Sequence, residues 1–159
     1  MSAKLGRLPK ALIGVLLTFL GGPNACRAEL RVAAAQDGDW VGVHVWNDSG
    51  AAIRVNRRLL FGRLSEGADL ELRSASLEAI PPVGIVEIIE LSDLDLVVIR
   101  PNEVIGRYYT ACFLARLYGL GVGSYVVTVA YSPEMEWLPA VKSKVVLSDR
   151  VELRIPSCE

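Results

Sequence analysis

The sequence is poor in the residues that build metal and redox centres. Its 159 residues include one histidine, two methionines and three cysteines, and the formal net charge is only −1. The single histidine, His44, excludes a metal site that needs several histidines, and three cysteines are too few for a zinc framework or a disulfide-dense miniprotein. A nearly neutral chain also lacks the basic surface that nucleic acid requires. We expect neither a cofactor nor a nucleic-acid partner.

The sequence is rich in apolar residues. Hydrophobic residues make up 52% of the chain and charged residues 22%, which excludes disorder for most of it. No internal repeat, low-complexity block or Gly/Ser linker divides the chain. One compact domain is therefore expected.

The first 28 residues differ from the rest and have the order of a secretory signal peptide. A positively charged start is followed by an apolar run over residues 11–20 and by a helix-breaking Gly-Gly-Pro at 21–23. Cys26 and Ala28 then supply small residues before a cleavage site. The apolar run is shorter than the roughly 20 residues of a membrane-spanning helix, so we expect no stable membrane span after cleavage.

Removal of residues 1–28 makes the remaining domain, residues 29–159, more acidic. The basic residues of the leader are Lys4, Arg7, Lys10 and Arg27, and it has no acidic residue. Of the 17 basic and 18 acidic residues of the chain, 13 basic and all 18 acidic ones therefore remain, which gives a formal charge of −5. This charge argues further against binding to phosphate backbones. About 130 residues can bury one stable core without the support of disulfides or bound metals.

Short alternating or β-branched runs bounded by turn residues recur about every 8 to 12 residues, which is typical of an all-β sandwich or barrel. Residues 114–118 have helical spacing for only about one turn and are predicted as a corner. Pro81-Pro82 favours a loop or sheet edge at 77–83. The predicted strands are 30–34, 40–46, 51–55, 58–61, 68–74, 84–91, 94–99, 104–113, 123–131, 140–147 and 149–155.

The strand at 40–46 is among the clearest of these. Three alternating valines share one of its faces, so His44 is expected on the opposite, solvent-facing side. The turn 47–50 follows, and Asn47-Asp48-Ser49 also matches an N-glycosylation acceptor, which matters only if the exporting cell glycosylates. Turn chemistry is the simpler account of these residues.

The segment Leu120–Tyr125 favours a sandwich over a barrel. It has the form L-x-x-G-x-Y just before the strand 123–131, where sandwiches place a tyrosine corner. The hydroxyl of Tyr125 is then expected to bond to backbone upstream. The second cysteine of antibody domains would stand at Val127, so the antibody-type bridge is absent.

Cys112 and Cys158 remain as an even pair after cleavage. In an exported chain they are candidates for a disulfide, which would contribute roughly 3 to 4 kcal/mol by closing its loop. The alternative is a buried free thiol at Cys112 and a free Cys158 in the terminal segment. The sequence leaves both open.

Four segments together resemble bacterial exported immunoglobulin-like β-sandwich proteins of uncharacterised function. They are I-R-P-N-E-V from Ile99, L-Y at Leu117, G-S-Y-V-V-T-V-A-Y from Gly123 and W-x-x-x-V-x-S-x-x-V from Trp137. Asn102 stands where the group usually has glycine. The resemblance implies an immunoglobulin-like β-sandwich of seven to nine short antiparallel strands and brings no catalytic residues with it.

Candidate catalytic or metal-binding groups are sparse. Three carboxylate pairs at i and i+2 are of the type that calcium or acid/base chemistry uses, yet turn chemistry explains them adequately: Asp37 with Asp39, Asp93 with Asp95, and Glu134 with Glu136. The glycines at 119–123 precede a strand and open no helix, so they serve a corner and not a phosphate. We assign no catalytic, cofactor-binding or metal-binding residues.

The large aromatic residues are numerous for a domain of this size. Core packing is the simplest role for most of them. If two or more of Trp40, Trp46 and Trp137 are exposed together, they would form a patch for a protein partner or a carbohydrate.

The leading hypothesis is an exported, non-catalytic binding or accessory module. It would act in the periplasm or outside the cell, through loops or an exposed sheet face, with another extracytoplasmic protein as partner. One alternative is a protease inhibitor or a small hydrolase that uses loop carboxylates or Ser132. Another is a structural component of an envelope assembly, in which an edge strand at 30–35 adds to a neighbour's sheet.

Overall fold

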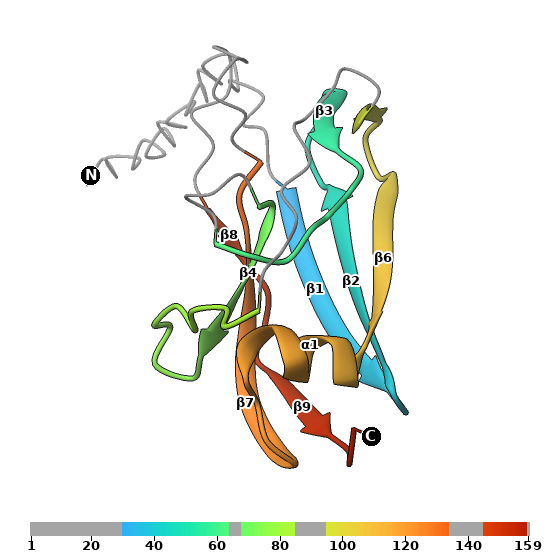
Figure 1. Cartoon of the computed structure of the whole chain (residues 1–159). Helices are drawn as coiled ribbons and strands as arrows, with labels where there is room; N and C mark the ends of the chain where they lie inside the picture. Colours follow the sequence, from blue (N-terminus) through green and yellow to red (C-terminus); the bar gives the residue numbers. More distant parts are fainter. Residues whose placement is uncertain (1–29, 64–67, 85–94, 134–144, 159) are drawn as a thin grey trace, which may run out of the picture.

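The computed structural model describes residues 30–63, 68–84, 95–133 and 145–158. The predicted signal peptide and Trp137 lie outside these residues, as does nearly all of the predicted strand 84–91. Within the described residues, strands form antiparallel sheets and there is one short helix (Figure 1). The all-β class that the strand spacing predicts is therefore confirmed.

The first sheet has three strands in the order β1-β2-β6. They are β1 (Leu30–Asp37), β2 (Trp40–Asn47) and β6 (Val104–Thr110), and each pair is antiparallel. A two-residue turn joins β1 to β2, where Asp37 pairs with Trp40. Gly38 in this turn has φ 55°, a region that favours glycine and allows the tight hairpin.

The second sheet is built around β7 (Gly123–Tyr131), whose bounds are those predicted. On one side β7 pairs with β4 (Leu70–Ser74), and on the other with β8 (Val146–Leu147) and β9 (Val151–Ile155). Ser148 lies between β8 and β9 and keeps contact with β7, because its N–H donates to the Val129 carbonyl at 2.9 Å. The two short strands thus follow β7 like one interrupted strand.

A small third sheet pairs β3 (Ile53–Asn56) with β5 (Leu96–Ile99). The predicted strand at 58–61 is wrong, since only Phe61 makes a single bridge, to Leu70. The cause is local. Leu59 has φ 48°, and the backbone N–H of Leu60 donates to the carboxylate of Asp69.

Residues Ala111–Tyr118 form the helix α1, which corrects two predictions. The strand predicted over 104–113 ends at Thr110, and the predicted corner at 114–118 belongs to the helix. Thr110 caps the start, because its hydroxyl accepts from the Phe113 N–H at 3.1 Å. Gly119 ends the helix with φ 64°, the left-handed conformation typical of a helix C-terminus.

One hydrophobic core lies between the first and second sheets, and α1 packs against one end of it (Figure 1). The alternating valines of β2 face this core, as predicted, and so does the inward side of β7. The core members from β2, β4, α1, β7 and β9 include Val41, Val43, Val45, Leu72, Leu114, Leu117, Val127, Val129, Tyr131 and Leu153.

A disulfide between Cys112 and Cys158 ties α1 to the segment that follows β9. The two residues are 46 positions apart in sequence. Of the two alternatives that the sequence leaves open, the structure has the bonded pair. The link fixes the C-terminal segment against the helix that covers the core.

Candidate functional site

The outer face of the sheet β1-β2-β6 carries a row of large side chains. Because strand residues alternate between faces, the residues of β2 that lie between the core valines point away from the core. The register places Gly42 opposite Tyr108 and His44 opposite Gly106. The outer face comprises Arg31, Ala33, Ala35 and Asp37 of β1, Trp40, Gly42, His44 and Trp46 of β2, and Val104, Gly106 and Tyr108 of β6.

Two aromatic residues of this face are largely exposed. Trp40 is 54% exposed and Tyr108 is 62% exposed, while Trp46 and His44 are half-buried. Single exposed apolar residues are ordinary on a protein surface, but neighbouring exposed aromatics mark interaction sites. His44 lies on the solvent-facing side of its strand, as predicted.

Two glycines allow the rings to lie close to the sheet. A Cβ atom at Gly42 would come within 2.9 Å of the Tyr108 ring, and a Cβ at Gly106 within 2.4 Å of the His44 ring. Any larger residue at Gly106 would therefore displace the imidazole. Because they lack a side chain, the two glycines leave space for an aromatic ring from the neighbouring strand to pack against the sheet.

The rings form a continuous row across the two strands. The His44 centroid lies 5.5 Å from that of Trp46 and 5.6 Å from that of Tyr108, and the second contact is edge-on, with an interplanar angle of 82°. These are the separations and geometries that aromatic pairs favour. The row is thus held by its own contacts.

Arg31 occupies the Trp46 end of the row. Its guanidinium carbon lies 4.4 Å from the Trp46 ring centroid, and its Nε donates to Oδ2 of Asp48 at 2.8 Å. The cation is therefore held between an aromatic face and a carboxylate. An exposed pair of this kind contributes little to stability, but it orders this end of the face.

A pocket of about 570 Å³ lies at the Trp40 end of the same row. Trp40, His44 and Tyr108 supply aromatic walls, and small residues supply the floor. Its lining residues are Ala35, Asp37, Trp40, Gly42, His44 and Tyr108. Asp37 is the one acidic residue among them, and no lysine or arginine lines the pocket.

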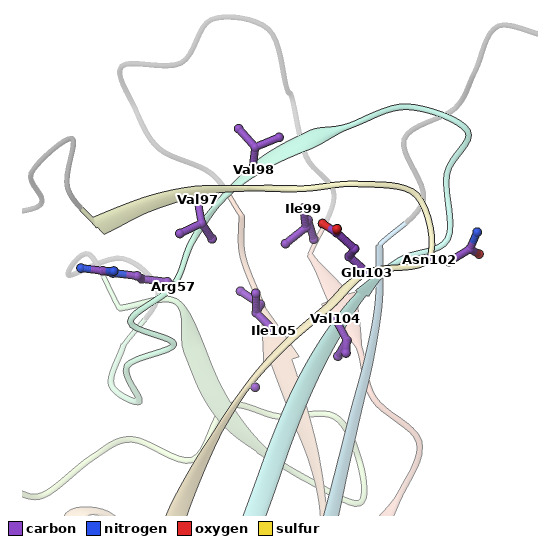
Figure 2. A pocket seen from close by; sticks show the side chains of 9 residues that line it. Arg57, Val97, Val98, Ile99, Asn102, Glu103, Val104 and Ile105 are labelled. Atoms are coloured by element: carbon purple, nitrogen blue, oxygen red, sulfur yellow. The ribbon is translucent and has the colours of Figure 1, made fainter.

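A second pocket, of about 640 Å³, lies between β5 and the beginning of β6. Val97, Ile99 and Ile105 turn toward one another there, with Arg57 at one end and Glu103 at the other (Figure 2). Glu103 is already engaged, because its Oε2 accepts from the Arg100 N–H at 2.7 Å. The pocket offers mainly an apolar surface.

The edge of β6 beside this second pocket pairs with no described strand. At one end of β6 the Glu103 carbonyl accepts from the Asn47 N–H, and at the other end the Ala111 N–H donates to the Asp39 carbonyl. Both residues therefore bond toward β2. Antiparallel pairing alternates, so the N–H and C=O groups of Val104, Gly106 and Tyr108 point away from β2. These groups form an open strand edge.

The other predicted site residues have structural surroundings. The Tyr125 hydroxyl donates to the carbonyl of Gly121 at 3.0 Å, which is backbone four residues upstream. Trp40 and Trp46 share the outer face described above. Ser132 follows β7, on a different sheet from His44, and its N–H donates to the Asp69 carbonyl at 2.9 Å.

The glycosylation acceptor at Asn47 is closed in the folded chain. Its side chain is buried, and its amide N–H groups donate to the carbonyls of Ala51 at 2.7 Å and Ile99 at 2.9 Å. Its Oδ1 accepts from the backbone N–H and the hydroxyl of Ser49. The turn interpretation of this motif is the one that the structure supports.

The predicted carboxylate pairs do not gather into a metal site within the described residues, where no three histidine, cysteine or acidic side chains cluster as ligands. Asp37 and Asp39 are both exposed at the β1–β2 turn. Asp93, Glu134 and Glu136 lie outside the described residues.

One buried carboxylate was not singled out by sequence. Asp69 accepts from the Asn56 side-chain amide at 2.8 Å and from the Leu60 N–H at 3.1 Å. Burial raises the pKa of Asp69 to about 6, although these hydrogen bonds and Arg58 oppose the shift. Its partners are structural ones, so we place it in the scaffold.

Sequence comparison finds no relative of this chain. A scan against protein-family models matched none, and a search of curated proteins found no match. Among the described residues, the only helix is the eight-residue α1, and none is long and apolar enough to cross a membrane.

Proposed function

We propose that this chain is an exported, non-catalytic binding module that recognises another extracytoplasmic protein through the outer face of β1-β2-β6. The observation that carries the proposal is the exposed pair Trp40 and Tyr108, 54% and 62% exposed, at one end of an ordered aromatic row. Exposed aromatic residues of this kind supply most of the binding energy in many protein interfaces. The Tyr108 ring is already positioned by its contacts with Gly42 and with the His44 ring, which lowers the entropy cost of ordering this side chain on binding.

The proposed fold is an immunoglobulin-like β-sandwich over residues 29–159, after a signal peptide at 1–28. Two antiparallel sheets that share one core support this assignment, as does the hydrogen bond from Tyr125 to Gly121. The disulfide between Cys112 and Cys158 supports export, since such bonds persist in oxidising compartments. A periplasmic or secreted location follows from the proposal.

A native pull-down from an extracytoplasmic fraction tests the binding function. The double variant Trp40→Ala, Tyr108→Ala should lose the captured partner while its far-UV circular dichroism and thermal midpoint stay close to those of the parent. The matched control is Val122→Ala, Val126→Ala, which trims two residues that are 73% and 50% exposed elsewhere on the surface. Equal capture by both double variants would contradict the proposal.

A structural role in an envelope assembly is the second candidate, and the open edge of β6 favours it. An extended segment of a neighbour would pair with the groups of Val104 and Gly106 and place a side chain in the apolar pocket of Figure 2. Val104→Pro removes one outward N–H at the start of the strand and leaves the bonds to β2 in place. Loss of assembly in this variant supports strand addition, and intact assembly argues against it.

A further inference from the structure

We propose that the pocket at the Trp40 end of the outer face binds a cationic side chain, arginine or lysine, presented by the partner protein. This inference rests on the proposed function, because it names the chemistry by which the same face would recognise its partner. The pocket volume of about 570 Å³ is ample for one such side chain.

The charge of the pocket is the first argument. Asp37 is its only acidic residue, and the described residues pair no cation with its carboxylate. The other large lining residues are aromatic: Trp40, Tyr108 and His44. A carboxylate beside aromatic faces attracts a cation both by charge and through the ring quadrupoles.

The opposite end of the row gives an internal precedent. There the guanidinium of Arg31 lies 4.4 Å from the Trp46 centroid while its Nε bonds to Asp48. The same combination of indole and carboxylate recurs at Trp40 and Asp37, without a cation of the chain's own. The face therefore has two similar sites for a cationic side chain, and Arg31 of the chain itself occupies the one at Trp46.

The pocket is also prepared for its occupant. Tyr108 lies over Gly42 and contacts the His44 ring, which in turn contacts Trp46, so the Tyr108 wall is in position before a ligand binds. Ala35 and Gly42 leave room beneath the rings. A side chain entering here removes water from Asp37 and both aromatic faces, which strengthens the attraction.

Tripeptide probes test the inference on the purified, disulfide-bonded protein. The probes are acetyl-Gly-Arg-Gly-amide and its citrulline counterpart, which has nearly the same shape and no charge. The readout is the indole N–H signal of Trp40 in a ¹⁵N–¹H spectrum, identified with Trp40→Phe. We expect the arginine probe to shift this signal and to bind about fivefold more tightly than the citrulline probe.

Two variants that remove the same charge separate the pocket from the general field of the protein. Asp37→Asn should weaken the arginine probe about fivefold, whereas Asp39→Asn, in the adjoining turn and outside the pocket lining, should leave it unchanged. Equal weakening by both variants would overturn the inference. Equal binding of the arginine and citrulline probes would overturn it as well.

The tests of the cation pocket and of the proposed function fail separately. If partner capture depends on Trp40 and Tyr108 but the arginine probe shifts nothing, the face binds and the cation assignment is wrong. If chitohexaose shifts the Trp40 signal and the arginine probe does not, the ligand is a carbohydrate and the cation assignment is again overturned. Binding of the arginine probe without any captured partner contradicts the proposed function and supports the pocket chemistry.

Discussion

The side chain of Gln36 pairs with the backbone of Arg154 as a neighbouring strand would. Its Nε2 donates to the Arg154 carbonyl at 2.8 Å, and its Oε1 accepts from the Arg154 N–H at 2.7 Å. Gln36 belongs to β1 of the first sheet and Arg154 to β9 of the second. This amide therefore joins the two sheets and occupies part of the β9 edge.

Replacing Gln36 by alanine should lower the free energy of unfolding by about 1 to 2 kcal/mol, because its two hydrogen bonds to Arg154 and a third to the Gly38 carbonyl are lost. The freed edge of β9 should also increase self-association. Urea unfolding measures the first effect and size-exclusion chromatography the second. Arg154→Ala is the control, since it keeps the bonded backbone and should leave the urea midpoint nearly unchanged. A similar loss in both variants would contradict the role given to Gln36.

Asn47→Ala should be more damaging, at about 3 kcal/mol, because it leaves several buried backbone partners without a hydrogen bond. Among those partners are the carbonyl of Ile99 and the N–H of Ser49. The change is measured by urea unfolding beside Asp48→Ala, which removes only the exposed pair with Arg31. A small loss at Asn47, equal to that at Asp48, would disagree with the observed network.

Two buried tyrosines should respond oppositely to loss of their hydroxyl groups. Tyr131 is fully buried and its hydroxyl has no hydrogen-bond partner within the described residues, so Tyr131→Phe should stabilise the protein by about 1 kcal/mol. The Tyr118 hydroxyl accepts from the Leu72 N–H at 3.2 Å. Tyr118→Phe should therefore cost about 1 to 2 kcal/mol. Thermal unfolding of both variants checks the contrast, and equal signs would refute it.

The raised pKa of Asp69 predicts that stability falls as pH rises through a defined window. The pKa is about 6 in the folded chain against an ordinary value of 3.8, so between these values the folded state binds more protons than the unfolded state. The contribution of this group is thus fully present below about pH 4. It is lost by about pH 6 to 7 and amounts to about 3 kcal/mol at most.

Urea unfolding across this pH range, in parent and Asp69→Asn proteins, measures the effect. The variant should lose the downward slope whatever its absolute stability, because the asparagine does not titrate. Asp39→Asn, which changes an exposed carboxylate, should keep the slope. An unchanged slope in the Asp69 variant would show that another group is responsible.

Alternation predicts the strands that face one core on one side. This is why β2 and β7 lie almost where the sequence places them. The helix α1 was missed because its first residues read as a continuation of the strand before it. Its signals were present, however: Thr110 as a cap, apolar residues on one helical face and Gly119 after the last turn.

The candidate site was predictable only in part. Trp40 and Trp46 follow from alternation along one strand, and both were singled out. Tyr108 and Asp37 join them through the register of neighbouring strands, which one sequence does not reveal. The local pattern around 58–61 misled for a different reason, since the buried carboxylate of Asp69 draws that backbone out of a strand.

The glycines beneath the rings predict correlated substitutions on this face. A Cβ at position 106 has no room while an imidazole stands at position 44, and position 42 is linked in the same way to the ring of Tyr108. In any descendant of this chain, each glycine and its ring should therefore be kept or lost as a pair. That joint substitution pattern would distinguish homologues that retain the aromatic face from those that share the scaffold alone.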